Sequence, residues 1–189
     1  MRPYLVLLPI LAALASELPA QVRRNQPTGD SRLGAFWARN GETKGLGLEA
    51  EITVSGAAVV CAEAVRVDDG VNRGDLVSAG LGWSERTSYG RFAATYSWGK
   101  VDDAATRHDR EIARLIYSYD VGRDWQLEVS LNRYLNPDTL APDLTATRFM
   151  FRYGNGGHLR LDLGYSSKDA LTGLRGGTET WFAGLSLGF

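Results

Sequence analysis

The sequence has little of the chemistry that marks several large classes of protein. Its 189 residues include one cysteine and two histidines, so there is no intramolecular disulfide framework and no Cys/His cluster with the spacing of a zinc site. The 21 Lys and Arg nearly balance the 22 Asp and Glu, which gives no electrostatic argument for a nucleic-acid partner. No apolar run reaches about 18 residues, which leaves no candidate for a membrane-spanning helix.

The one apolar run of note lies at the N-terminus. Arg2 precedes mostly apolar residues at positions 4–14, a length typical of a signal-peptide core and too short for a transmembrane helix. Small residues allow cleavage after Ala15 or after Ala20, and both remain open. The expected organisation is a signal peptide at residues 1–20, a periplasmic N-terminal lead at 21–30 and one folded domain at 31–189.

The rest of the chain is rich in glycine and aromatic residues, and it alternates. In the last segment Trp181, Ala183, Leu185, Leu187 and Phe189 share one face, while smaller residues occupy most of the other. This period of two predicts β-strands with one apolar face. The same alternation recurs in six earlier segments, at 77–84, 92–99, 113–121, 125–132, 148–153 and 159–166.

The N-terminal third alternates less regularly. Residues 46–54 show the pattern, whereas 31–39 and 56–67 have weaker contrast between their faces. We therefore expect ten strands, with eight as the alternative if the region 31–67 pairs differently. Residues 103–116 also have some helical spacing, and we interpret them as a loop that runs into a strand.

Short and long connections alternate along the chain. Tight turns are expected near residues 54–56, 87–90, 122–124 and 155–157, and longer polar loops at 67–75, 99–110, 135–144 and 167–178. Alternating turns and loops are typical of an antiparallel up-and-down transmembrane β-barrel, in which the turns and both termini face the periplasm.

Alternation does not show which face is wet, and a secreted lipocalin-like barrel with its apolar face inward is the alternative. The positions of the aromatic residues favour the membrane. They form two groups, Trp83, Phe92, Trp125, Tyr153 and Phe189 near the turns and Trp98, Tyr165 and Trp181 near the loops. Two such belts are the aromatic girdles of a membrane barrel.

The terminal pattern Trp181-x-Ala183-x-Leu185-x-Leu187-x-Phe189 resembles the C-terminal signature of bacterial outer-membrane β-barrel proteins. The chain from 31 to 189 resembles the small porin-like barrels as a broad class. This resemblance implies a Gram-negative outer membrane, contact with its lipid and lipopolysaccharide, and folding with periplasmic chaperones and the barrel-assembly machinery, for which the terminal pattern would be the assembly signal.

Charged residues on the polar face are expected to line the lumen. They are Glu49, Glu51, Arg114, Asp120, Glu128, Arg148, Arg152, Arg160 and Asp162. Buried unpaired charge is costly, so we expect these arginines and carboxylates to form ion pairs. The pairs would fill the interior of a structural barrel or line a narrow passage for small solutes, and we favour the filled interior.

Other functions have weaker support. His108, with Ser97 as a nucleophile, is the candidate for a lipopolysaccharide-modifying hydrolase, while His158 lies beside a turn on the opposite side. The charged loops are also compatible with a barrel that binds a partner at the cell surface or contacts lipopolysaccharide, and this alternative stays open. Cys61 is interpreted as a small apolar residue, and no cofactor or metal is expected. The prediction is a non-enzymatic, porin-like barrel.

Overall fold

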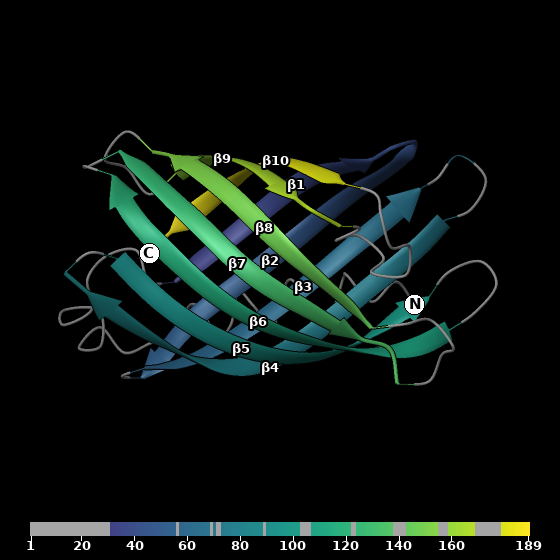
Figure 1. Cartoon of the computed structure of the whole chain (residues 1–189), viewed down its shortest axis with the longest axis horizontal. Coiled ribbons are helices and arrows are strands. Elements are labelled where there is room, and N and C mark those ends of the chain that lie inside the picture. The colour runs from purple at the N-terminus through teal and green to yellow at the C-terminus, as the bar shows by residue number, and fades with distance from the viewer. Residues whose placement is uncertain are drawn as a thin grey trace.

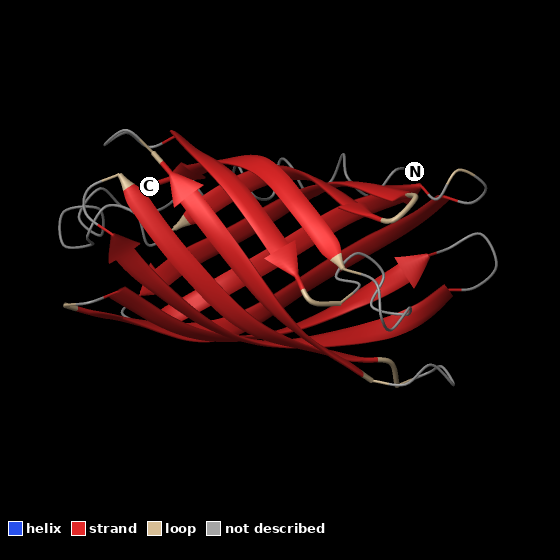
Figure 2. Cartoon of the chain, turned by 45° about the horizontal axis from the view of Figure 1, so that its top comes forward, coloured by secondary structure: helices blue, strands red, loops and turns tan. Residues whose placement is uncertain are grey.

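The computed structural model describes residues 31–55, 57–68, 70, 73–88, 90–102, 107–121, 124–137, 143–154, 159–168 and 179–189. The expected signal peptide and lead, and His158, lie outside these residues. In the described parts of the chain all regular structure is strand, and no helix there is long and apolar enough to cross a membrane (Figure 2).

Ten antiparallel strands form one closed barrel (Figure 1). Each strand pairs with its neighbours in the sequence, and β1 pairs with β10 to close the sheet. The expected up-and-down barrel is confirmed, with ten strands and not eight. The strands are β1 (Arg32–Asn40), β2 (Thr43–Ser55), β3 (Ala58–Asp68), β4 (Arg73–Thr87), β5 (Gly90–Asp102), β6 (Arg107–Val121), β7 (Trp125–Leu135), β8 (Leu144–Tyr153), β9 (Leu159–Ser166) and β10 (Thr180–Gly188).

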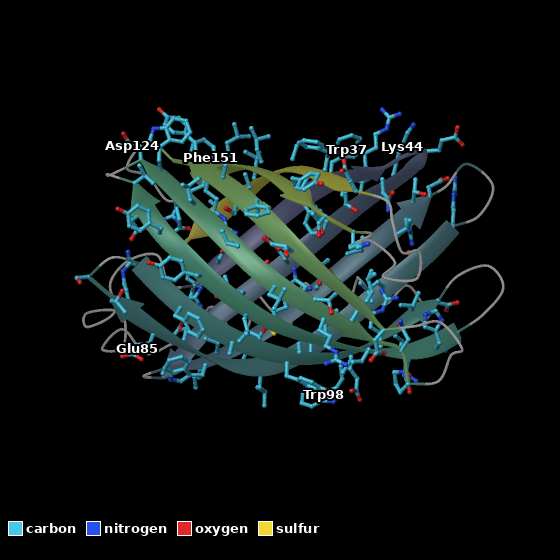
Figure 3. The ribbon with its side chains drawn as sticks, viewed as in Figure 1. Trp37, Lys44, Glu85, Trp98, Asp124 and Phe151 are labelled. Carbon is cyan, nitrogen blue, oxygen red and sulfur yellow. The ribbon has the colours of Figure 1, made fainter. Side chains whose placement is uncertain are left out.

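The two ends of the barrel differ. At the end that we call the turn end, Ser31 and Phe189 exchange backbone hydrogen bonds of 3.3 and 3.1 Å. The turn end also holds the β2–β3, β4–β5, β6–β7 and β8–β9 connections, and the other five connections lie at the loop end. In Figure 3, Glu85 and Asp124 mark the turn end and Lys44 the loop end.

Two loops are shorter than expected. The ladder between β5 and β6 continues to the pair Asp102–Arg107, so only 103–106 separate these strands. Likewise β3 and β4 remain paired as far as Asp68–Arg73. Opposite charges meet across the extended strands, as in the ion pair of 3.1 Å between Lys100 and Asp109, and such cross-strand pairs favour continued pairing.

Apolar side chains point away from the barrel axis and polar ones toward it. In β7, Leu127 and Val129 are each 42% exposed, whereas Glu128 is 7% and Ser130 4% exposed. Trp37, Trp98 and Phe151 also project outward in Figure 3. A lipocalin-like barrel needs the reverse arrangement, so the orientation of the side chains argues against that alternative.

The alternation predicts a polar inward face, but part of that face is apolar. In the half nearer the loop end, an apolar cluster occupies the interior, and Phe36 packs edge-on against Phe182 with ring centroids 5.8 Å apart. Glycine makes room for it, because a Cβ at Gly47 would overlap the Phe36 ring. We call this cluster the apolar layer: Phe36, Ala38, Val65, Val67, Leu76, Val101, Ile112, Tyr134, Ala146, Met150 and Phe182.

Candidate functional site in the barrel interior

The charged residues lie mainly between the apolar layer and the turn end, and we call them the charged layer. A buried pair at its centre joins adjacent strands β7 and β8. The guanidinium of Arg152 donates two hydrogen bonds to the carboxylate of Glu128, at 2.5 and 3.0 Å. The Ser118 hydroxyl donates a third, at 3.2 Å. The side chains of Arg152 and Glu128 are only 2% and 8% exposed, so water does little to weaken their attraction.

Further ion pairs extend from this centre across the barrel. Arg32, at the start of β1, lies 3.8 Å from Glu128 and 3.3 Å from Glu49 on β2. Arg148 approaches the other oxygen of Glu49 at 4.0 Å, and Nε of Arg152 lies 3.5 Å from Asp162. The structure thus places five of the expected lumen residues in one chain of contacts that Arg32 joins: Glu49, Glu128, Arg148, Arg152 and Asp162.

Three more of the expected residues have partners elsewhere in the layer. Glu51 forms an ion pair with Arg91, and Arg114 forms one with Glu63. Asp120 pairs with Arg86 at 2.7 Å, near the turn end, where its side chain is 36% exposed. Arg160 is partly buried and forms no ion pair with the part of the chain that the structure describes.

Sequence reasoning missed the partners Arg32, Glu63, Arg86 and Arg91. Arg32 begins the first strand, where the contrast between faces is weak, and Arg86 and Arg91 flank a tight turn, where charge normally faces water. Glu63 shares a face with Cys61, and the alternation of β3 is the signal that identifies it as an inward residue.

The interior is filled at the level of these charges. Two cavities there measure about 20 and 30 Å³, room for one or two water molecules each. Toward the loop end the apolar layer occupies the same lumen. The described side chains therefore fill the lumen at two levels, with the apolar layer nearer the loop end and the charged layer nearer the turn end.

The expected girdle residues lie on the outer wall. At the turn end, Trp125 stacks with Tyr153, with ring centroids 4.3 Å apart, and Trp83 with Phe92, at 6.2 Å. Nearer the loop end, Tyr165 packs against Trp181 and Trp98 against Tyr96, at 4.9 and 5.0 Å. Trp37 on β1, which is 41% exposed, also lies toward the loop end and was missed.

The expected assembly signal lies on β10, the strand that closes the barrel against β1, and its last residue, Phe189, directly follows that strand. Trp181, Leu185, Leu187 and Phe189 are between 38% and 59% exposed on the outer wall. Ala183 lies on the same face, opposite Trp37.

The candidate catalytic residues are not brought together. His108 points into the barrel and is 6% exposed. It pairs in register with Val101 on β5. Val101 lies four residues from Ser97, which places these two residues about 13 Å apart along the strand. Ser97 instead makes a hydrogen bond of 3.4 Å with Cys61. Among the described residues no group of three His, Cys, Asp or Glu could hold a metal ion.

Comparison with known proteins identifies a fold. No family model and no curated protein sequence matches the chain. The structure is similar to that of the NanC porin, with a TM-score of 0.51 and 10% identity over 83% of this chain and 98% of that one. At this level of identity the similarity shows the fold alone, a porin-like barrel.

Two other solved structures are more distant. The anion-selective porin from Comamonas acidovorans gives a TM-score of 0.43 at 13% identity, over 77% of this chain and 49% of that one. The translocator domain of the autotransporter NalP from Neisseria meningitidis gives 0.43 at 11% identity, over 95% and 93%.

Proposed function

We propose that this chain is an integral outer-membrane β-barrel of the porin type, and that it acts as a closed structural barrel and not as an open pore. The observation that carries the proposal is the polarity of the wall. Large apolar side chains cover the outside, while carboxylates and guanidinium groups lie inside. Contiguous exposed apolar surface of this kind suits lipid and not water.

The backbone supports the same location. Because the sheet closes on itself through β1 and β10, no strand edge is left to be hydrogen-bonded by water. The aromatic pairs toward each end of the outer wall are suited to the two membrane interfaces. In this orientation the turn end faces the periplasm, the loop end faces outward, and lipid and lipopolysaccharide surround the wall.

The filled interior supports a structural role. Porins of 16 to 18 strands hold an open aqueous channel, whereas an eight-stranded barrel is just wide enough for side chains to fill, and ten strands are close to the second case. Here cavities of about 20 and 30 Å³ admit water and nothing as large as a sugar or an amino acid. A narrow passage for small solutes would require both layers to move.

Conductance in planar lipid bilayers tests the choice between a closed barrel and a passage. We expect no discrete steps from the native chain, and steps only from a variant that opens both layers, with Phe36→Ala and Phe182→Ala in the apolar layer and Arg152→Ala and Glu128→Ala in the charged layer. A matched control, Phe149→Ala, removes an outward ring that is 49% exposed and should stay silent. Discrete steps from the native chain, altered by Arg148→Ala, would refute the closed barrel and establish the passage.

Membrane location is tested separately by gel mobility with and without boiling in detergent. A closed barrel resists cold detergent, so the outer-membrane fraction should contain a band that shifts on boiling. Recovery of the chain from the soluble periplasm, with no shift, would refute the membrane proposal.

Assembly by the barrel-assembly machinery and periplasmic chaperones follows from the same proposal. Phe189, at the end of the closing strand, is the proposed recognition residue, and Phe189→Ala should lower the folded fraction in cells without lowering it in purified lipid vesicles. An equal loss in both settings would mean that Phe189 serves stability alone.

The charges at the loop end argue against a dedicated binding surface, because they pair with one another. Arg66 lies 2.9 Å from Asp75, and Arg73 lies 3.1 Å from Asp68. A hydrolase is disfavoured by the inward position of His108. Unchanged lipid A mass in cells that express the chain is the expected result.

A further inference from the structure

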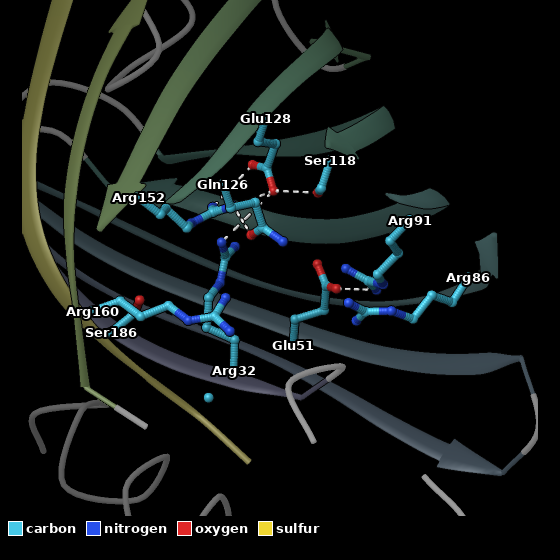
Figure 4. Close-up of a pocket in the computed structure, with 11 residues that line it drawn as sticks. Arg32, Glu51, Arg86, Arg91, Ser118, Gln126, Glu128, Arg152, Arg160 and Ser186 are labelled. Atoms are coloured by element: carbon cyan, nitrogen blue, oxygen red, sulfur yellow. Dashed lines mark hydrogen bonds and ion pairs between the residues drawn. The ribbon is translucent and has the colours of Figure 1, made fainter. Parts of the chain in front are cut away.

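Arginine side chains converge at the turn end of the barrel. One of the two small interior cavities lies there, lined by arginines that come from five strands, and Figure 4 shows them turned toward one another. Each lies near the end of its strand at this mouth. They are Arg32 on β1, Arg86 on β4, Arg91 on β5, Arg152 on β8 and Arg160 on β9.

The carboxylates near this cavity are already engaged. Glu51 pairs with Arg91, and Glu128 is shared between Arg152 and Arg32. Among the described residues that line the cavity, Glu51 and Glu128 are the carboxylates, against five arginines. Three more lie close behind it: Asp120 on Arg86, Asp162 beside Arg152, and Glu49, which Arg32 shares with a sixth arginine, Arg148.

Arg160 is the surplus cation. It forms no ion pair among the residues that the structure describes, although it lines the cavity with the other four arginines. In addition, the buried Nε atom of Arg91 has no hydrogen-bond acceptor in the structure. A guanidinium without an ion pair and a buried N–H donor without an acceptor therefore lie beside the same cavity, and an anion bound there would meet both.

We propose that the turn-end mouth is a binding site for a phosphate-type oxyanion, either inorganic phosphate or the terminal phosphate of a molecule on that side of the membrane. The planar fork of arginine matches the oxygens of phosphate, with two parallel N–H donors per guanidinium. One oxygen replaces water in the cavity of about 20 Å³, and the rest of the anion lies at the rim beside Arg86, whose side chain is 34% exposed. Only the assignment of this mouth to the periplasm rests on the proposed function.

Thermal unfolding of the purified barrel in a phosphate-free detergent tests the site, with the boiling-dependent gel shift as the readout of folded protein. Sodium phosphate should raise the unfolding midpoint above that in sodium chloride of equal ionic strength. At a phosphate concentration ten times the Kd, the ratio of folded to unfolded protein should rise about tenfold. Equal midpoints in the two salts up to high phosphate would overturn the proposal.

Variants locate the effect. Arg160→Gln removes the surplus charge and should reduce phosphate affinity at least tenfold. Arg86→Gln, at the exposed rim, gives a second test if the first variant does not fold. Arg73→Gln is the matched control, because its side chain is 81% exposed at the loop end, and it should leave the phosphate response unchanged. An equal loss in all three variants would show attraction by net charge alone and overturn the site.

A parallel experiment with added lipid distinguishes binding of free phosphate from binding of a lipid headgroup. Phosphatidylglycerol added to the micelles reaches the outer wall, whereas inorganic phosphate reaches the mouth. Stabilisation by inorganic phosphate supports the site, and stabilisation by the lipid alone overturns it. Because the gel shift on boiling is scored in every arm, loss of the phosphate effect is distinguishable from failure of the barrel proposal.

Discussion

The pair between Arg152 and Glu128 gives the sharpest test of the charged layer. Arg152→Met keeps much of the side-chain volume but removes the guanidinium, and with it two hydrogen bonds of 2.5 and 3.0 Å. The carboxylate of Glu128 then stays in an interior where it is 8% exposed. We expect the variant to be destabilised because it buries a charge that has lost its main partner.

The size of the effect follows from what remains. Removing one member of a buried pair costs about 3–5 kcal/mol when the other is left alone. Glu128 keeps the hydroxyl of Ser118 at 3.2 Å and Arg32 at 3.8 Å, whereas Asp162 loses its contact of 3.5 Å with Nε of Arg152, so the expected loss is at least about 3 kcal/mol. That corresponds to a fall of roughly a hundredfold in the ratio of folded to unfolded protein.

A double-mutant cycle isolates the interaction. Glu128→Gln in the Arg152→Met background removes the orphaned charge, so the double variant should be more stable than Arg152→Met alone by about 1–2 kcal/mol. Urea unfolding in lipid vesicles, followed by tryptophan fluorescence, measures all four proteins. Arg73→Met, at the exposed loop end, serves as the control and should unfold as the native chain does. Strictly additive losses would refute the reasoning, because the two groups would then not interact.

Three further outcomes are expected. Gly47→Ala should destabilise the barrel by about 1–3 kcal/mol in urea unfolding, because its Cβ overlaps the Phe36 ring; an unchanged midpoint would show that the apolar layer is loosely packed. Val129→Arg, midway along an outward face, should cost about 2–4 kcal/mol in vesicles, against about 0–1 for Val121→Arg at the strand end; equal costs would argue against a bilayer around the wall. Cys61, the one cysteine, is 7% exposed inside, so a maleimide should label it only after boiling; labelling of the folded barrel would mean an open lumen.

The strand pattern was readable from the sequence because one wall of the barrel has a uniform environment. Outward residues of β7 and β10, such as Leu127 and Leu185, all face the same apolar surroundings, so their alternation is regular. The contrast weakens in β3, where Val65 and Val67 point inward and Val60 and Ala62 lie on the opposite face. Apolar side chains therefore occur on both faces of that strand, which is why its pattern was indistinct.

The apolar layer could not be predicted for the same reason. An inward Phe36 or Ile112 looks like an irregularity in a polar face until the closed sheet brings such residues from many strands to one level. The pairing partners depend on closure as well. Arg91 reaches Glu51 from β5 to β2, and Arg114 reaches Glu63 from β6 to β3, across strands that are not neighbours. No local spacing in the sequence encodes these contacts.

These cross-lumen pairs explain how a ten-stranded wall can hold one shape. Backbone hydrogen bonds join each strand only to its two neighbours, so the ladder alone permits the barrel to flatten. Arg114 with Glu63, and Arg91 with Glu51, connect strands on either side of the lumen, and flattening would break them in an interior where unpaired charge is costly. The charge that closes the lumen therefore also braces the wall, and this bracing supports the proposal of a closed barrel.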